Sequence, residues 1–247
     1  MSNNSVYLAY KKAPPESTWH VVGLLSYSEP SKKFIFKYTK GAEKDLRFKP
    51  FNGMENIKAE YSSEDLFPLF KNRILYEKRP EYIDFITWLG LEKGASPIDI
   101  LALSGGHRIT DSLQTFGSVR VNEDGTFKHS FFVHGLSSLK ESQLERIKIL
   151  RTEEKLYPCL DCQNEYDDSA VLIRTNDPKE IVGYIPRYLS KTVTDLLNKS
   201  LSSISLYVEA VNNEAPLQYK LRCTLEGMLP EDGSIRFHDS DEFIPLI

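Results

Sequence analysis

The alternation of side chains along Lys33–Tyr38 is the feature that most constrains the fold of this chain. The aromatic residues at positions 34, 36 and 38 alternate with lysine or isoleucine, which is the period of two expected for a β-strand. Val6–Tyr10 and Trp19–Leu25 are also predicted to be strands. The first forty residues therefore predict a three-stranded antiparallel meander.

Helical signals follow this meander. Ser62 precedes an acidic residue, Asp65, by three positions, and this spacing predicts the start of a helix. Pro80 is placed to open a second helix, with apolar residues at 82, 85, 86 and 89 and a stop at Gly90. Pro97 is predicted to open a third helix through Leu103, which Gly105-Gly106 would end. Helices that follow strands predict an α+β domain over residues 1–116.

The pattern returns to strands from Gly117. Val171–Arg174 and Ile181–Ile185 are predicted to form a hairpin around a turn at residues 176–179. Ile204–Val211 and Tyr219–Gly227 are predicted to be paired strands, and Leu189–Ser200 has helical spacing. Residues 142–150 are compatible with either a helix or a strand. Residues 117–247 therefore predict a second, β-rich domain.

The length and apolar content limit the class of protein. A chain of 247 residues suggests one or two domains, and 40% hydrophobic residues are enough for two modest cores. The longest apolar runs span only a few residues, whereas a membrane helix needs about 20. The N-terminus lacks the basic and then apolar pattern of a signal peptide. We therefore expect a cytoplasmic protein that does not enter a membrane.

Charge is distributed unevenly along the chain. Residues 1–129 carry a formal charge of +2, and the remaining residues carry −6. Domains that bind nucleic acid mainly through its phosphates are basic. The acidic second half therefore argues against strong non-specific DNA binding there.

Two segments of the second half, taken in their order along the chain, match a known pair of motifs. Asn164-Glu165-Tyr166-Asp167-Asp168-Ser169-Ala170-Val171 is followed, across the predicted hairpin, by Val182-Gly183-Tyr184-Ile185-Pro186-Arg187. Together they resemble the signature of HIRAN domains, and His134-Gly135-Leu136 fits the strand that opens such domains. The resemblance implies a small modified β-barrel similar to OB folds, with one or two helices.

The resemblance also implies a binding function rather than an enzyme. HIRAN domains attached to DNA-remodelling helicases bind the 3′ end of single-stranded DNA. By this resemblance the ring of Tyr166 would stack on the terminal base, and the carboxylate of Asp167 would accept a hydrogen bond from the 3′-hydroxyl. Tyr184 and Arg187 would lie near the phosphates, with Asn164 beside them.

The chain departs from the family pattern after the opening glycine and leucine. The family places an arginine and an aromatic residue there, whereas this chain has Ser137 and Ser138. One wall of the base sandwich and one phosphate-binding cation are therefore missing. A purely structural interpretation also stays open, because Asn164 and Asp167 could instead cap a tight turn by accepting backbone hydrogen bonds.

The first half has a second resemblance. Val22-Gly23-Leu24-Leu25, the strand at 34–38 and the segment Leu66–Arg73 resemble the N-terminal subdomain of HipA-type kinases. No catalytic loop with a metal-binding pair is evident, so a kinase core is not expected. In tripartite systems this subdomain is a separate chain that modulates the kinase. The resemblance implies a helix-turn-helix or kinase-like protein partner within a bacterial toxin–antitoxin or defence module.

Two further motifs are candidate sites. Cys159-Leu160-Asp161-Cys162 is one Cys pair, and a zinc site needs four ligands, so no metal or other cofactor is predicted. The stretch Ser104–Asp111 has a glycine pair but lacks the spacing of a phosphate-binding loop, so a helix-ending turn is favoured. A candidate interaction surface combines basic residues of the first half with this stretch: Lys71, Arg73, Arg79, Arg108 and Asp111.

These features predict a non-enzymatic DNA-binding protein that recognises single-stranded DNA or its 3′ end. The alternative is a protein-interaction subunit, resembling an antitoxin or a regulator, that docks a helix-turn-helix or HipA-like kinase partner. An enzyme that uses residues 105–111 is a third hypothesis.

Overall fold

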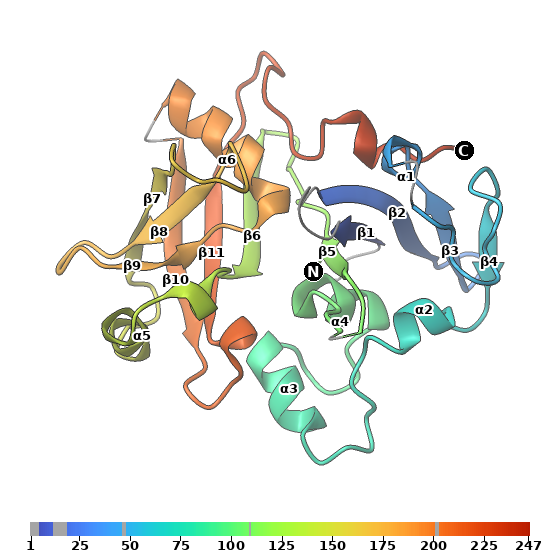
Figure 1. Ribbon diagram of the computed structural model, residues 1–247, viewed down its shortest axis with the longest axis horizontal. Helices are drawn as coiled ribbons and strands as arrows, with labels where there is room; N and C mark the ends of the chain where they lie inside the picture. The colour runs from blue at the N-terminus through green and yellow to red at the C-terminus, as the bar shows by residue number, and fades with distance from the viewer. Residues whose placement is uncertain (1–4, 12–18, 46–47, 109, 201–202) are drawn as a thin grey trace. The chain divides into compact units, whose positions relative to one another are not determined.

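The computed structural model of the chain describes residues 5–11, 19–45, 48–108, 110–200 and 203–247 (Figure 1). It divides into two compact units. The first unit contains Met1–Ser118 together with His238–Ile247, and the second contains Val119–Phe237. The last ten residues therefore group with the first unit, although the sequence placed them in a second domain of residues 117–247.

The first unit is built on a five-stranded antiparallel sheet. Its strands are β1 (Ser5–Lys11), β2 (Trp19–Ser28), β3 (Lys33–Tyr38), β4 (Tyr61–Ser63) and β5 (Leu113–Gly117), in the order β4-β3-β2-β1-β5. The predicted meander of the first three strands is confirmed. Alternation has its expected effect in β3, where Phe34, Phe36 and Tyr38 are buried in the core of this unit.

Four helices accompany this sheet: α1 (Gly41–Lys44), α2 (Pro68–Lys71), α3 (Tyr82–Leu89) and α4 (Pro97–Ser104). Helices α3 and α4 end at the glycines predicted from the sequence, because Gly90 and Gly105 both adopt the left-handed conformation that ends a helix. The helix predicted to start at Ser62 is wrong. Residues 61–63 pair with β3, and the short helix begins only at Pro68.

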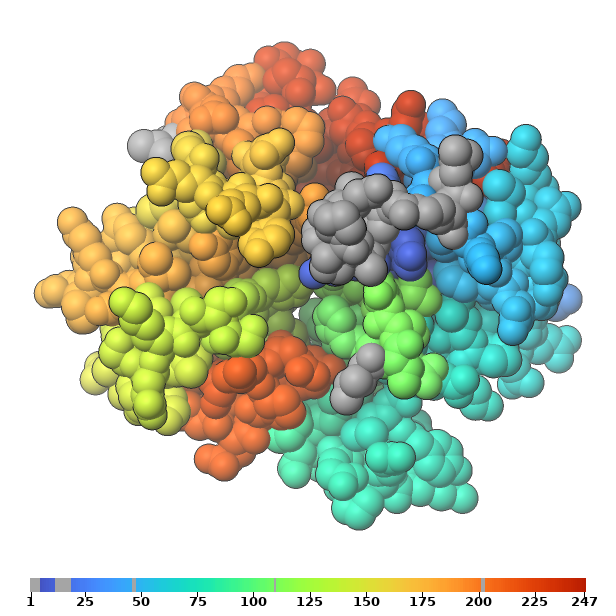
Figure 2. All heavy atoms as spheres, viewed as in Figure 1, coloured from blue at the N-terminus to red at the C-terminus, as the bar shows by residue number. Residues whose placement is uncertain are grey.

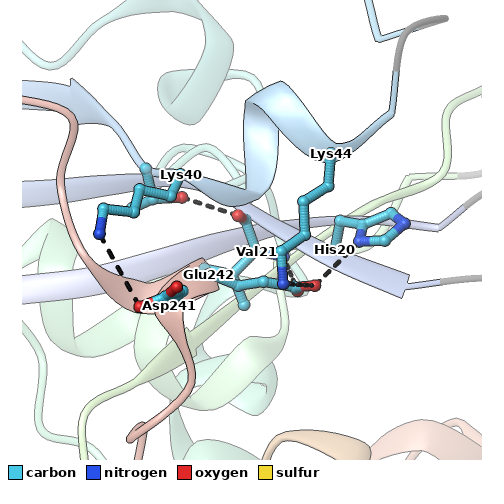
Figure 3. A network of polar contacts seen from close by, with 7 residues as sticks. His20, Val21, Lys40, Lys44, Asp241 and Glu242 are labelled. Carbon is cyan, nitrogen blue, oxygen red and sulfur yellow. Dashed lines mark hydrogen bonds and ion pairs between the residues drawn. The ribbon is translucent and has the colours of Figure 1, made fainter.

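The C-terminal segment of the chain contacts β2 and α1 of this unit (Figure 3), and it also hydrogen-bonds to β3. A short 3₁₀ helix, η3 (Asp241–Phe243), places the Glu242 carboxylate 3.1 Å from His20 Nδ1 and 3.1 Å from Lys44 Nζ. The same carboxylate accepts a hydrogen bond from the backbone N–H of Val21. Leu246 then donates a backbone hydrogen bond to the carbonyl of Tyr38. These contacts explain why residues 238–247 group with the first unit.

The second unit is a curled half-barrel of six antiparallel strands. They are β6 (Thr126–Phe132), β7 (Lys155–Leu160), β8 (Val171–Arg174), β9 (Ile181–Tyr184), β10 (Ile204–Val211) and β11 (Leu221–Met228), in the order β6-β11-β10-β7-β8-β9. Beyond the end of β6, His134 and Tyr184 exchange two backbone hydrogen bonds of 2.9 Å. This single bridge joins the two edges of the sheet.

Helical segments complete the second unit. They are η1 (Leu136–Ser138), α5 (Glu141–Lys148), α6 (Arg187–Lys199) and η2 (Leu217–Tyr219). Residues 142–150, for which the sequence is compatible with either a helix or a strand, therefore lie mostly in a helix. Helix α6 buries Leu189, Val193 and Leu196 against the inward side chains of the sheet. The α+β class and the β-rich second unit with two helices are therefore confirmed. Within the described ranges, no helix combines the length and apolar character needed to cross a bilayer.

A half-buried histidine, His129, gives this unit a pH-dependent stability. His129 Nε2 lies 3.1 Å from the hydroxyl of Tyr188, and burial lowers the pKa of His129 to about 4. The unfolded chain therefore takes up this proton first, near pH 6.5, and stability falls as the pH drops from 6.5 towards 4. We expect a loss of about 2 kcal/mol between pH 7 and pH 5 from this residue.

Thermal unfolding of the wild type and of His129→Gln at several pH values measures this loss, because other groups titrate in both proteins. We expect the difference in stability between the two proteins to change with pH over this range. A difference that stays constant from pH 7 to pH 5 would contradict the assignment of a neutral His129.

Candidate nucleic-acid interface

The turn between β7 and β8 is held by hydrogen bonds from side chains to the backbone. Asn164 Oδ1 accepts the N–H groups of Tyr166 at 3.0 Å and of Asp167 at 3.1 Å. Asp167 Oδ1 accepts the N–H of Ser169 at 3.0 Å. The capping role that the sequence left open for Asn164 and Asp167 is therefore present. For Asn164 both acceptor bonds serve this turn, so its contribution is to fix the two residues that follow it.

Fixing the turn leaves the ring of Tyr166 in solvent. Tyr166 is 72% exposed, which is the highest exposure among the large hydrophobic residues of the described chain. Asp167 is partly buried, and its second oxygen, Oδ2, lies 4.0 Å from Arg187 Nε. An exposed ring and an adjacent acidic residue, on a backbone that is already ordered, can bind a ligand without a large loss of conformational entropy. In Figure 2 the yellow segment that contains this turn lies on the face towards the viewer.

Asp161 connects this turn to β9. Its Oδ2 accepts hydrogen bonds from Asn164 Nδ2 at 3.1 Å and from the hydroxyl of Tyr184 at 3.0 Å. The bond from Asn164, with a smaller effect of the bond from Tyr184, lowers the pKa of Asp161. Desolvation and the bond to Asp161 raise the pKa of Tyr184. Tyr184 is therefore a neutral hydroxyl that donates to an ionised carboxylate at neutral pH.

The sequence did not identify Asp161 as a site residue, because its only evident pattern there is the Cys-x-x-Cys motif. An available signal was the Asp at three positions before Asn164, a spacing that suits a turn closed by side chains. The two cysteines are free, Cys162 exposed and Cys159 partly buried. No group of three or more His, Cys, Asp and Glu side chains in the described part of the chain could hold a metal ion.

Two glycines hold the opening strand against Tyr184. Gly183 has a φ of +130°, and a Cβ atom there would lie 2.3 Å from Val133 Cγ1 and 2.6 Å from the carbonyl oxygen of His134. A Cβ atom on Gly135 would lie 3.0 Å from Cδ2 of Tyr184. Both positions are structural, because they permit the close approach at which the two edges of the sheet meet.

The remaining residues of the predicted interface surround this turn. Arg187 is exposed at the start of α6, and the hydroxyl of Tyr184 is held by Asp161. The chain thus brings Asn164, Tyr166 and Asp167 into one turn, with a direct contact to Arg187 and an indirect one to Tyr184. Ser137 and Ser138 are exposed in η1.

The interaction surface predicted for the first unit needs a correction. Arg73 is buried, with 1% of its side chain exposed, and its guanidinium donates to both carboxylate oxygens of Asp111 and to the carbonyl of Gly106. Arg73 therefore cannot contact a partner, and it instead ties α2 to the turn after α4. Burial opposes the ionisation of Asp111, but the hydrogen bond from Arg73 prevails and lowers its pKa. Lys71, Arg79 and Arg108 are exposed.

Two clefts of the second unit lie away from this turn. One has a volume of about 590 Å³ and is lined by the turn at residues 121–125 and by the segment that follows β11. The other has a volume of about 480 Å³ and is lined by residues of β6, β10 and the end of β11. None of the five residues of the predicted interface lines either cleft. The candidate interface is therefore a turn that lies outside both clefts.

Comparison with known proteins identifies one region of the chain. Residues 126–229 match the HIRAN domain family. Among solved structures, the HIRAN domain of human HLTF is similar at 16% identity, with a TM-score of 0.33, over 47% of this chain and 81% of that one. A protein from Lactobacillus plantarum is similar at 20% identity, also with a TM-score of 0.33, over 43% of this chain and all of that one. No curated protein matches. The half-barrel with the turn at residues 164–168, and not the chain as a whole, is therefore the part of this protein that matches the HIRAN family.

Proposed function

We propose that the second unit is a non-enzymatic module that binds the 3′ end of single-stranded DNA. The observation that supports this proposal is the exposed ring of Tyr166, the residue before Asp167, on a turn whose backbone is fixed by Asn164. An aromatic ring that is 72% exposed gains by stacking on a base, because both flat surfaces leave water. The match to the HIRAN family supports the same proposal.

Each side chain has a distinct role in this proposal. The ring of Tyr166 stacks on the terminal base, and Asp167 Oδ2 accepts a hydrogen bond from the 3′-hydroxyl. The Oδ1 atom remains engaged with Ser169 and sets the orientation of the carboxylate. Arg187, close to Asp167, offers its guanidinium to the nearest phosphate.

The charge of this unit limits the affinity to local contacts. Residues 119–237 contain 15 Lys and Arg residues and 18 Asp and Glu residues, so no general attraction to DNA is expected. Ser137 and Ser138 also leave the base without a second aromatic wall from η1. We therefore expect weak binding at low salt that requires a free 3′ end.

Asp167→Asn tests the role of the carboxylate. The wild type is expected to prefer a 3′-hydroxyl over a 3′-phosphate, because the phosphate would place negative charge against Asp167. Hydrogen bonds to charged groups contribute about 1.5–3 kcal/mol, so the preference should be about tenfold or more. In Asp167→Asn the amide can still cap Ser169, but the preference should be largely lost. Fluorescence anisotropy with labelled single strands of both kinds measures this.

Asp168→Asn is the matched control, since it removes the same charge from the adjacent exposed residue. It should retain the preference for a 3′-hydroxyl. Absence of any single-strand binding by the wild type at low salt would remove the proposed function altogether.

The wider context that we propose is a bacterial toxin–antitoxin or defence module in which the first unit docks a helix-turn-helix or kinase-like protein. The exposed Tyr76 and Ile83 of that unit, 61% and 53% exposed, support a protein contact there. The identity of the genes that neighbour this one tests the proposed context. Neighbours that encode neither kind of protein would count against this context.

A further inference from the structure

The outer face of β7 and β8 carries a second aromatic group next to the proposed 3′-end site. Tyr157 in β7 is the register partner of Arg174 in β8, and the two side chains lie on the same face of the sheet. The guanidinium carbon of Arg174 lies 4.8 Å from the centroid of the Tyr157 ring, and Lys155 Nζ lies 5.8 Å from the same centroid. Tyr157 and Arg174 are partly exposed, and Lys155 is exposed.

This group lies next to the proposed site along the same two strands. Cys159 pairs with Leu172, and Leu172 pairs with Tyr184, which donates its hydroxyl to Asp161 at the turn. Tyr157 and Arg174 are the next cross-strand pair on the same face, two residues further along each strand. Two residues along a strand advance by roughly 7 Å, so the second group is one row away from Tyr184.

The charges of this face favour an anionic partner. Neither Lys155 nor Arg174 makes an ion pair with a carboxylate in the part of the chain that the structure describes. Arg174 donates only to the backbone carbonyl of Thr175, which holds its guanidinium over the ring. On the neighbouring strands, Glu209 already pairs with Arg222. Two available cations on an otherwise acidic unit therefore mark a local site for negative charge.

We propose that Tyr157, Arg174 and Lys155 bind the nucleotides that lie on the 5′ side of the terminal one. Bases stack on guanidinium planes as well as on aromatic rings, and the two cations lie where phosphates of the same strand would pass. The ligand is thus a single strand several nucleotides long, running from the turn at Tyr166 across the outer face of β8 and β7. This inference rests on the proposed 3′-end function and extends it.

The test compares a short ligand with a long one. Fluorescence anisotropy is measured at low salt with a dinucleotide and with a strand of about ten nucleotides, both ending in a 3′-hydroxyl. The wild type should bind the longer strand more tightly. Tyr157→Ala should lose about tenfold for the long strand and leave the dinucleotide unchanged. Arg174→Ala should also lower the salt dependence of long-strand binding, by about 0.7 in the log–log slope.

Two control variants separate stacking from structural effects. Tyr157→Phe keeps the ring and should bind like the wild type. Lys191→Ala removes an exposed cation of α6 and should change neither ligand.

The outcomes distinguish this inference from the function on which it rests. Long-strand binding that is unchanged in Tyr157→Ala but lost in Tyr166→Ala overturns the extended path and leaves the 3′-end function standing. Equal losses for both ligands in Tyr157→Ala overturn it as well, because they indicate a structural role. Absence of wild-type binding to either ligand removes both proposals together.

Discussion

Tyr166→Ala is expected to weaken the binding of a single strand with a 3′-hydroxyl by about ten- to a hundredfold. Stacking of a base on an aromatic ring contributes about 1–3 kcal/mol, and here a single ring is expected to supply all of the stacking on the terminal base. The terminal base would therefore lose its main contact. Titration by fluorescence anisotropy at low salt measures the effect.

Because 72% of Tyr166 is exposed, its truncation should leave the folded unit intact. Tyr166→Phe should bind like the wild type, since stacking needs the ring and not the hydroxyl. Tyr76→Ala, at another exposed tyrosine in the first unit, is the control for a general loss of aromatic surface. Equal affinity of Tyr166→Ala and the wild type would show that the base is bound elsewhere.

Gly183→Ala is expected to destabilise the second unit by about 4 kcal/mol. A residue with a side chain at φ +130° costs about 1–3 kcal/mol. The new Cβ atom would also lie 2.6 Å from the carbonyl oxygen of His134 and 2.3 Å from Val133 Cγ1. Overpacking of this kind costs about 1–3 kcal/mol more. Such a loss is a large fraction of the 5–15 kcal/mol, roughly, that holds a domain folded.

This substitution would weaken the contact that joins the two edges of the sheet. Relief of the clash would move the backbone of His134 away from Tyr184, with which it exchanges two hydrogen bonds. Urea denaturation should therefore show a lower midpoint, and DNA binding should weaken with it. Gly233→Ala is the matched control, because Gly233 also has a positive φ, of +66°, but its added Cβ would meet only the flexible end of Arg236. If the two variants proved equally stable, the close approach at Gly183 would not be a determinant of the fold.

Local patterns were enough to predict most of the regular structure. The alternation in Lys33–Tyr38, the hairpin over residues 171–185 and the helix ends at Gly90 and Gly105 all depend on residues within a few positions of one another. The candidate turn was also visible, because Asn164 and Asp167 are residue types that bond to the nearby backbone. A period or a turn signal is a property of the neighbouring residues, and the sequence contains it directly.

Other features depend on partners that are far away in the chain. Ser62 carries a helix-start signal, yet residues 61–63 pair with β3, because the edge of the sheet offers them backbone hydrogen bonds. Arg73 had the pattern of a surface cation, and it is buried because Asp111 lies beside it. Asp161 acquires its role from Tyr184, and Glu242 from His20 and Lys44.

The sequence by itself thus determined where most strands and helices and the capped turn occur, and that a tyrosine and an aspartate follow one another in that turn. Only the tertiary structure decided which edges of the sheet meet, which charges are buried, and that Tyr157 and Arg174 lie on the same face as Tyr184. The physical reason is that the first group of features depends on backbone geometry over a few residues. The second depends on hydrogen bonds and packing between segments whose pairing is fixed only when the whole unit folds.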